Sequence, residues 1–216
     1  MRSRAICLYA MRVLELFCGT KSVSACLKKK YKTIDVVSLD IDAKFGATVT
    51  IDILKWDYTV YPPMYFDVVW ASPPCTQYSK AHRRGTRNLT HADKVVRRTL
   101  KIIKHLKPTY WYIENPADGG LLQHRTFMRP LARSKLTCCY CRYGFLFRKK
   151  TNIWTNKPGL QLKVCNVKTP CKAKRAYGRH ACTAQRSRSS RAKHGYGARR
   201  VENAYKIPNL LIKQLI

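Results

Sequence analysis

The sequence predicts an α/β fold with a doubly wound, mostly parallel sheet. Short apolar runs alternate with helix-like segments over residues 11–116, and this alternation is typical of consecutive strand–helix–strand units. Polar or reactive side chains follow the apolar runs, at the strand ends where open parallel sheets bind ligands. With 216 residues, of which 45% are hydrophobic, the chain can bury one core of this kind.

The first predicted strand is the apolar run over residues 11–17. A glycine turn follows it, and residues 21–30 then carry helix-spaced apolar positions and a basic end that suits a helix C-terminus. A second strand is predicted over residues 34–39 and a weaker third over 47–53.

A fourth strand over residues 66–70 precedes a cysteine-containing loop and a long helix. Thr90 and Asp93 have the spacing of a capping box, and apolar residues recur at helical intervals until Pro108 ends the pattern. A fifth strand is predicted over residues 110–114, where an Asn-Pro pair breaks it.

Three parts are predicted along the chain. Residues 11–156 form the main domain, because the alternating pattern ends near residue 156. Residues 157–200 are basic, contain Ser, Gly, Cys and His, and lack apolar periodicity. Residues 201–216 end in an apolar run that predicts a helix packed back on the main domain.

The charge balance indicates a polyanionic partner. Lys and Arg number 43 against 11 Asp and Glu, so the formal net charge is +32. A charge of this size repels itself unless a polyanion neutralises it, and nucleic acid is therefore the predicted partner. A general adaptation of the surface is the alternative, but the basic residues alternate with Tyr, Trp and His, which favours nucleic-acid binding.

Neither a membrane span nor an export signal is predicted. No stretch of about 18 apolar residues occurs, and the N-terminal apolar run is too short for a signal peptide. We therefore expect a soluble, intracellular protein. We also expect it to act as a monomer. In that setting the ten cysteines are interpreted as thiols, metal ligands or a nucleophile rather than as disulfides.

Acidic residues at the ends of the second and third predicted strands suit an adenosine-containing cofactor without phosphates. Asp40 is placed to accept hydrogen bonds from ribose hydroxyls, and Asp52 from an exocyclic amine. The turn at Gly19 lets the backbone approach a ligand closely, but no G-x-G-x-x-G pattern follows, so a pyrophosphate is not favoured. For Asp40 and for its neighbour Asp42, each taken alone, a solvated loop acid is the alternative interpretation.

Cys75 is the candidate nucleophile. Two prolines stiffen the chain before it, and the basic loop over residues 80–87 supplies cations that favour the reactive thiolate. Glu114, at the end of the next predicted strand, supplies a carboxyl group that burial keeps protonated, as a proton donor requires. The alternatives are an inert buried cysteine and a glutamate in a structural ion pair.

Three motifs in this order resemble those of the C5-cytosine methyltransferases, which use S-adenosylmethionine. They are Phe-Cys-Gly at residues 17–19, Ser-Pro-Pro-Cys at 72–75 and Glu-Asn-Pro at 114–116. The resemblance covers residues 11–156, and the segment over 203–211 is similar to the C-terminal segment that completes the family's cofactor pocket. It implies a Rossmann-like fold and methylation of a cytosine that is flipped out of double-stranded DNA.

The resemblance also implies roles for single residues. Cys75 adds to C6 of the cytosine, Glu114 protonates or hydrogen-bonds N3, and Asn115 orients the loop around Cys75. Either Arg148 or Lys149 reaches the cytosine or its phosphate. The implied cofactor residues are Glu15, Phe17 and Gly19 at the methionine end, Asp40 at the ribose, Ile41 and Asp52 at the adenine, together with Cys18, Pro73 and Asn203.

The chain departs from the family pattern at several points. Pro116 stands where most members have Val, Thr76 where many have Gln, and an Arg-x-Arg pair is replaced by Arg-Lys-Lys at residues 148–150. Residues 157–200 are shorter than a usual target-recognition domain, as in compact phage and large-virus members. The alternatives are the same chemistry on RNA, as in tRNA-methylating relatives, and a catalytically silent nucleic-acid-binding relative.

The basic segment also contains the pattern of a zinc site, in which Cys139 or Cys141 is the alternative to the last ligand. A metal would stabilise a segment with too little apolar content to fold by packing alone. Reduced cysteines without a metal are the other interpretation, and the surrounding Lys and Arg side chains are expected to lie along phosphates. The predicted ligands are Cys165, Cys171, His180 and Cys182.

Overall fold

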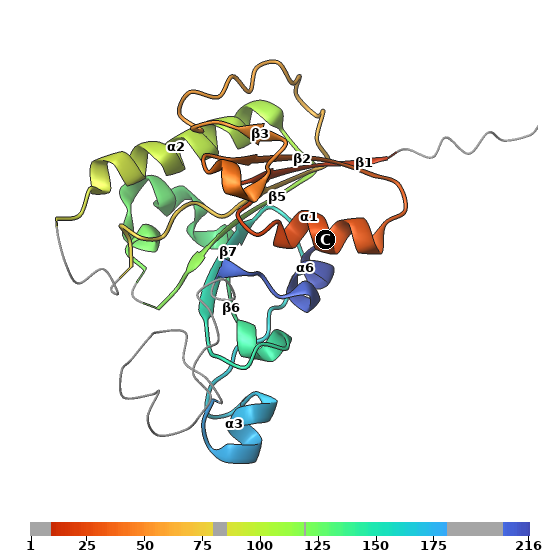
Figure 1. Cartoon of the computed structure of the whole chain (residues 1–216). Helices are drawn as coiled ribbons and strands as arrows, with labels where there is room; N and C mark the ends of the chain where they lie inside the picture. Colours follow the sequence, from red (N-terminus) through yellow and green to blue (C-terminus); the bar gives the residue numbers. More distant parts are fainter. Residues whose placement is uncertain (1–9, 80–85, 119, 181–204) are drawn as a thin grey trace, which may run out of the picture.

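The computed structural model of the chain describes residues 10–79, 86–118, 120–180 and 205–216. Its centre is one seven-stranded sheet with the strand order β3-β2-β1-β4-β5-β7-β6 (Figure 1). The predicted α/β class is confirmed. The strands are β1 (Met11–Leu16), β2 (Ile34–Asp40), β3 (Val49–Thr50), β4 (Val68–Ala71), β5 (Tyr110–Pro116), β6 (Lys135–Cys139) and β7 (Lys150–Thr155).

The five predicted strands form the parallel part of the sheet. β1 pairs in parallel with both β2 and β4, β2 pairs with β3, and β4 pairs with β5. The chain leaves β1 toward β3 and then returns to the other side of β1 at β4, so the winding direction reverses between β1 and β4. The carboxyl ends of these two strands therefore border the crevice in which such sheets bind ligands.

Helices cover both faces of the sheet, and this explains why the central strands are apolar without alternation. One core joins α2 to side chains such as Leu14 and Val69, and the other joins α1 and α6 to Val13 and Trp70. Figure 1 shows α2 on one side of the sheet and α1 with α6 on the other. The helices are α1 (Ser22–Lys30), α2 (Leu89–Leu106), α3 (Lys172–Tyr177) and α6 (Asn209–Leu215), with short 3-10 turns η1 (Ala43–Phe45), η2 (Leu122–His124), η3 (Thr126–Ser134) and η4 (Tyr140–Tyr143).

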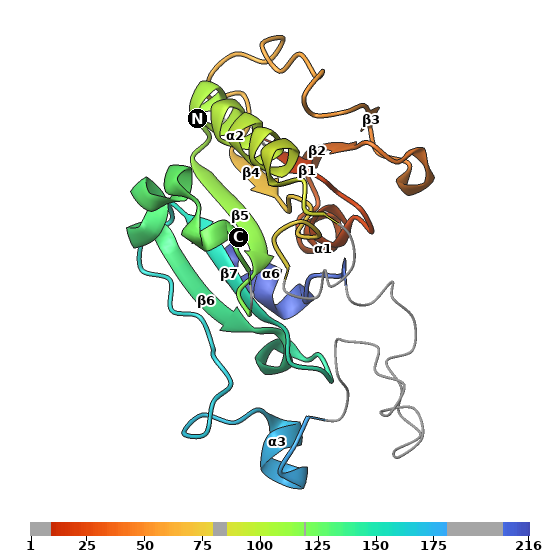
Figure 2. The ribbon, with the colours of Figure 1, turned by 90° about the vertical axis from the view of Figure 1, so that its left-hand side faces the viewer.

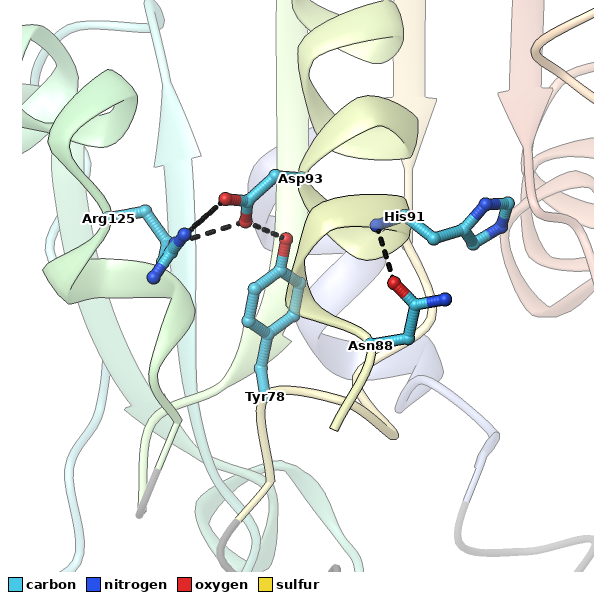
Figure 3. A network of polar contacts seen from close by, with 5 residues as sticks. All are labelled: Tyr78, Asn88, His91, Asp93 and Arg125. Atoms are coloured by element: carbon cyan, nitrogen blue, oxygen red, sulfur yellow. Dashed lines mark hydrogen bonds and ion pairs between the residues drawn. The ribbon is translucent and has the colours of Figure 1, made fainter. Parts of the chain in front are cut away.

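The start of α2 differs from the predicted capping box. Asn88 caps the helix, because its Oδ1 accepts a hydrogen bond of 2.9 Å from the backbone N–H of His91. Asp93 instead accepts a hydrogen bond from the hydroxyl of Tyr78 and forms an ion pair with Arg125 (Figure 3). α2 therefore begins at Leu89, two residues earlier than a cap at Thr90 would predict. Asp93 makes tertiary contacts instead of capping the helix.

The sequence predicted that the Asn-Pro pair would break the fifth strand, and this prediction is wrong. β5 continues to Pro116, which lies opposite Thr151 in an antiparallel ladder with β7. The strand persists because β7, which the sequence analysis did not predict, lies along it and is paired with β6 on its other side. Figure 2 shows these two antiparallel strands at the edge of the sheet.

The closing helix α6 packs on α1 and on Tyr112 of β5. Leu211 is fully buried, and the hydroxyl of Tyr112 in β5 donates a hydrogen bond of 2.6 Å to the carbonyl oxygen of Leu215. The neighbouring Leu210 is 58% exposed. No helix in the described parts of the chain is long and apolar enough to cross a membrane.

We predict that Leu211→Ala lowers the free energy of unfolding by about 3 kcal/mol, since it leaves a cavity beneath α6. Leu210→Ala is the matched control, and its exposed side chain should cost less than about 0.5 kcal/mol. Urea unfolding of both variants measures the difference. Equal losses would contradict the described packing of α6.

Candidate active site

The approach to Cys75 is fixed by hydrogen bonds from three neighbouring strands. The N–H of Ser72 donates to the carbonyl oxygen of Leu16 at the end of β1, and the indole N–H of Trp70 in β4 donates to Ser72 Oγ at 3.0 Å. From β5, Asn115 Nδ2 donates to the carbonyl oxygen of Pro73 at 3.0 Å. The loop therefore begins in a position that β1, β4 and β5 define together.

The chain after Cys75 is held in the same way. The carbonyl oxygen of Cys75 accepts hydrogen bonds from the N–H groups of Tyr78 and Ser79, at 3.0 and 2.9 Å. Tyr78 is fully buried, and its hydroxyl donates to Asp93, which also pairs with Arg125 (Figure 3). Loop residues on both sides of the thiol thus have fixed partners, while the Cys75 side chain itself is half-buried.

Glu114 lies on β5, the strand next to β4, and is 6% exposed. The hydroxyl of Tyr140 donates a hydrogen bond of 2.9 Å to its Oε1, and Lys149 Nζ lies 3.5 Å from the same oxygen. The ammonium group of Lys149 also lies 4.8 Å from the centre of the Tyr140 ring. The sequence analysis named Lys149 as one of two alternatives, but it did not name Tyr140.

The pKa of the Cys75 thiol is raised above its ordinary value. Burial is the largest cause, the nearby charge of Glu114 is the second, and Lys149 acts in the opposite direction. We had expected cations to favour the thiolate, but residues 80–85 of the expected basic loop lie outside the described parts of the chain. In the free protein the thiol is therefore held protonated.

Arg148 lies apart from the pair formed by Glu114 and Lys149. Its guanidinium pairs with Asp118 at 3.2 Å, and the side chain lines a hollow together with Cys165 and His180. Of the two candidates for contact with the base, Lys149 is the one that contacts Glu114.

The predicted cofactor residues around β1 form a tight turn. Phe17 and Gly19 both have left-handed backbone conformations, with φ of 57° and 46°. Glu15 is buried and accepts hydrogen bonds from the N–H groups of Val23 and Ser24, so it caps α1 from the neighbouring strand. Burial raises the pKa of Glu15, and burial followed by the charge of Glu15 raises the pKa of the Cys18 thiol to about 11.

Asp40 joins this turn to the end of β2. Its Oδ2 accepts a hydrogen bond from the N–H of Gly19, and its Oδ1 accepts one from the N–H of Asp42. Ile41 beside it is 68% exposed, so its apolar side chain is accessible at the end of β2.

The remaining predicted cofactor residues lie nearby or cannot be placed. The N–H of Ile51 donates to the carbonyl oxygen of Asp40, which brings the following residue, Asp52, to the end of β2. Asp52 is half-buried and caps the N–H of Leu54. Pro73 is buried below Cys75, and Asn203 lies outside the described residues.

A second group of reactive side chains lies beyond the end of β6. The ligand atoms of Cys141, Cys165, Cys171 and His180 all lie within 4.8 Å of one another. Three of them were predicted, Cys141 was one of the alternatives for the fourth, and Cys182 lies outside the described residues. The set of three thiols and one imidazole is compatible with zinc.

The fold and the site together define a protein of the α/β methyltransferase class. Residues 11–128 match the family model described as C-5 cytosine-specific DNA methylase. A protein of Frog virus 3 (isolate Goorha) named "Probable DNA (cytosine-5)-methyltransferase" is 34% identical over 178 residues, which cover 74% of this chain and 78% of that protein. The chain therefore belongs to the C-5 cytosine-specific DNA methylase family, as its motifs had indicated.

The fold is shared with a solved structure at low sequence identity. The Entamoeba histolytica methyltransferase EhMeth has a TM-score of 0.50 and 15% identity, over 73% of this chain and 57% of that one. A Spodoptera frugiperda DNMT2 variant has a TM-score of 0.49 and 16% identity, over 74% of this chain and 57% of that one. The chain spans little more than half the length of these two proteins.

We predict that the alkylation rate of Cys75 by iodoacetamide rises with pH to a midpoint above 9, the ordinary value for this thiol. Glu114→Gln should lower the midpoint, since it removes a negative charge that disfavours the thiolate, and Lys149→Gln should raise it. Mass spectrometry of the Cys75 peptide over a neutral to alkaline pH series measures all three. Shifts of the same sign in both variants, or no shift in either, would contradict the opposing effects of the two charges on Cys75.

Proposed function

We propose that the protein transfers a methyl group from S-adenosylmethionine to C5 of cytosine in double-stranded DNA. The observation that carries the proposal is that Cys75 and Glu114 follow or end two paired parallel strands, β4 and β5, at their carboxyl ends. Asn115 beside Glu114 donates a hydrogen bond to the carbonyl oxygen of Pro73 and so holds the Cys75 loop against β5. Family membership supports the same activity.

The residues at the ends of β1 to β3 are those we propose for S-adenosylmethionine. Carboxylates at Asp40 and Asp52 suit hydroxyl and amino donors, and the exposed Ile41 offers an apolar surface to a purine. The left-handed turn at Gly19 allows the backbone to approach the methionine end. Bound there, the cofactor supplies an electrophilic methyl group. Glu15 would act indirectly, because its carboxylate already caps α1.

In the proposed reaction the target cytosine leaves the base stack and enters the site between β4 and β5. Cys75 gives up its proton to solvent, and its sulfur forms a bond to C6 of the ring. Glu114 donates a hydrogen bond or a proton to N3, so that charge does not accumulate on the base. The nucleophilic C5 would take the methyl group from the sulfonium of S-adenosylmethionine, which leaves as S-adenosylhomocysteine. Loss of the C5 proton to solvent, with departure of the Cys75 sulfur as a thiolate, would restore the aromatic ring.

The contacts of Glu114 leave one of its two oxygens available to the base. Among the described residues, the side-chain partners of Glu114 are Tyr140 and Lys149, and both act on Oε1. Oε2 is the oxygen left to meet N3 of the base. Burial raises the pKa of Tyr140 far above its ordinary value, so its hydroxyl keeps its proton and acts as a hydrogen-bond donor.

The proposed division of the chain assigns substrate binding to its basic part. Residues 11–156 would bind the cofactor and carry out the chemistry, residues 157–200 would contact DNA, and 201–216 would complete the catalytic domain. A structural zinc ion at the Cys/His cluster is the second group that we propose, with no part in methyl transfer. Phosphate contacts by Lys and Arg should make DNA binding strongly salt-dependent.

We predict that the purified protein transfers labelled methyl groups to cytosine-containing duplex DNA, and that Cys75→Ala and Glu114→Gln abolish the transfer. A duplex with C5-fluorinated cytosine should trap the wild-type protein as a covalent adduct, because the fluorine cannot leave as a cation. Cys75→Ala should form no adduct. A fluorinated RNA hairpin serves as the second substrate: trapping on RNA alone would replace DNA as the target, and trapping by neither would contradict the mechanism.

We predict that Tyr140→Phe lowers the single-turnover rate about 10- to 100-fold, as expected when one hydrogen bond to a charged group is lost. Tyr143→Phe is the matched control, since that hydroxyl contacts the N–H of Lys163 and not Glu114. Equal single-turnover rates for the two variants would show that Tyr140 is only a packing residue.

A further inference from the structure

The Cys/His cluster is assembled from two separate parts of the chain. Cys141 belongs to η4, the turn that connects β6 to β7 at the edge of the sheet. Cys165, Cys171 and His180 belong to the segment after β7, whose helix α3 stands away from the sheet in both views (Figures 1 and 2). The four side chains therefore converge from the catalytic sheet on one side and the basic segment on the other.

We infer that these four side chains bind one zinc ion, and that the metal acts as a clamp that fastens the basic segment to the sheet edge carrying Tyr140. The ligand set is Cys141, Cys165, Cys171 and His180. The link to catalysis rests on the proposed function, whereas the metal site itself does not.

The geometry is close to that of a tetrahedral site. Ligand atoms about 2.3 Å from a zinc ion lie about 3.7 Å from one another. Cys165 Sγ and His180 Nε2 are 3.4 Å apart, and no pair in the group exceeds 4.8 Å. Shifts of about 1 Å are therefore enough to complete the coordination. Such shifts are within the reach of side-chain rotation.

Apolar packing does not explain why these residues meet. The six residues of α3 include no buried side chain. The small core beneath the segment consists of Cys139, Cys141, Cys165 and Cys171, with Val164 and Ala173 partly buried against it. A core made almost wholly of thiols buries too little hydrocarbon to hold a segment, and a metal commonly supplies the missing free energy.

Hydrogen bonds already hold the segment against η4 and the end of β6. The N–H of Cys139 donates to the carbonyl oxygen of Lys163 at 3.0 Å, and the guanidinium of Arg142 donates to the carbonyl oxygen of Pro170 at 2.6 Å. The N–H of Cys171 donates to Cys165 Sγ at 3.3 Å, as N–H groups do toward metal-bound thiolates. These hydrogen bonds thus bring the two segments that carry the ligands together without a metal.

The charge around the cluster suits a zinc site with three thiolates. Zinc with three thiolates and a neutral imidazole carries a net charge of about −1. Arg148, Lys174 and Arg179 line the adjoining hollow and offer positive charge to that centre. A site with fewer thiolates would carry no negative charge for these cations to compensate.

The clamp would place the basic segment relative to the reacting base. Cys141 directly follows Tyr140, whose hydroxyl holds Oε1 of Glu114. The N–H of Tyr140 donates to the carbonyl oxygen of Lys149, the second partner of Glu114. A metal that fixes Cys141 therefore fixes the turn that positions both partners of the catalytic carboxylate.

The first test is metal content. The full chain purified without chelator should hold about one zinc ion, and Cys141→Ser and Cys171→Ser should each bind it at least ten-fold more weakly. Cys75→Ser is the matched control: it removes an accessible thiol outside the cluster and should keep the metal. No metal in the wild-type chain, or full affinity in Cys141→Ser, overturns the inference. Because Cys75→Ser lacks the proposed nucleophile, its zinc content is independent of the proposed activity.

Cobalt substitution covers the case in which Cys141→Ser does not fold. Co²⁺ in the wild-type chain should show the visible absorption of a tetrahedral site and sulfur charge-transfer intensity for three thiolates. His180→Gln, which changes the least buried ligand, should keep the charge-transfer intensity but alter the visible bands. Intensity for two thiolates would remove Cys141 or another cysteine from the ligand set and contradict the clamp.

Hydrogen exchange tests the clamp apart from metal binding. Zinc should slow amide exchange in residues 140–143 as well as in 165–180, and chelation should reverse both effects. Protection confined to 165–180 would leave a zinc site but refute the link to the sheet. If the link holds and the protein nevertheless transfers no methyl group, the proposed function fails while the clamp stands.

Discussion

The hydrogen bond from Asn115 Nδ2 to the carbonyl oxygen of Pro73 is the contact on which the candidate site depends. It connects the strand that carries Glu114 to the loop that carries Cys75, and both of its partners are buried. Parallel pairing of β4 with β5 sets the spacing of the two strand ends, but a loop beyond a strand end has no ladder to define it. Two prolines limit the backbone of that loop, and the amide of Asn115 selects one position for it.

The antiparallel strands β6 and β7 and the turn between them supply the partners of Glu114, which the parallel strands do not provide. β5 would be an edge strand without β7, and Glu114 would face solvent rather than a buried partner. β7 covers that edge, and the turns before it bring Tyr140 and Lys149 to Oε1 of the carboxylate. The parallel strands thus carry the nucleophile and the acid, whereas the antiparallel pair controls the environment of the acid.

The sequence predicted the parallel strands and the pair Cys75 and Glu114, because buried apolar runs and compact motifs are local signals. It did not predict β6 or β7, since Lys-Leu-Thr-Cys-Cys and Lys-Thr-Asn-Ile-Trp-Thr show neither clear alternation nor a purely apolar run. Tyr140 was also missed, because its contact with Glu114 forms only when strands distant in the sequence pair in the sheet. The raised pKa of the Cys75 thiol was not predicted, because burial and the charge of Glu114, which a sequence does not show, outweigh the nearby charge of Lys149.

The few acidic residues explain why so large a positive charge remains uncompensated. Of the 11 acids, Glu15 caps α1, Asp40 and Asp52 hold backbone N–H groups at the cofactor end, and Asp93 fastens the Cys75 loop through Tyr78 and Arg125. These carboxylates perform internal tasks, so they neutralise little of the outer surface. The resulting repulsion weakens the folded state, and a polyanion that binds the surface relieves it. Substrate binding and stability are therefore coupled through the same charges.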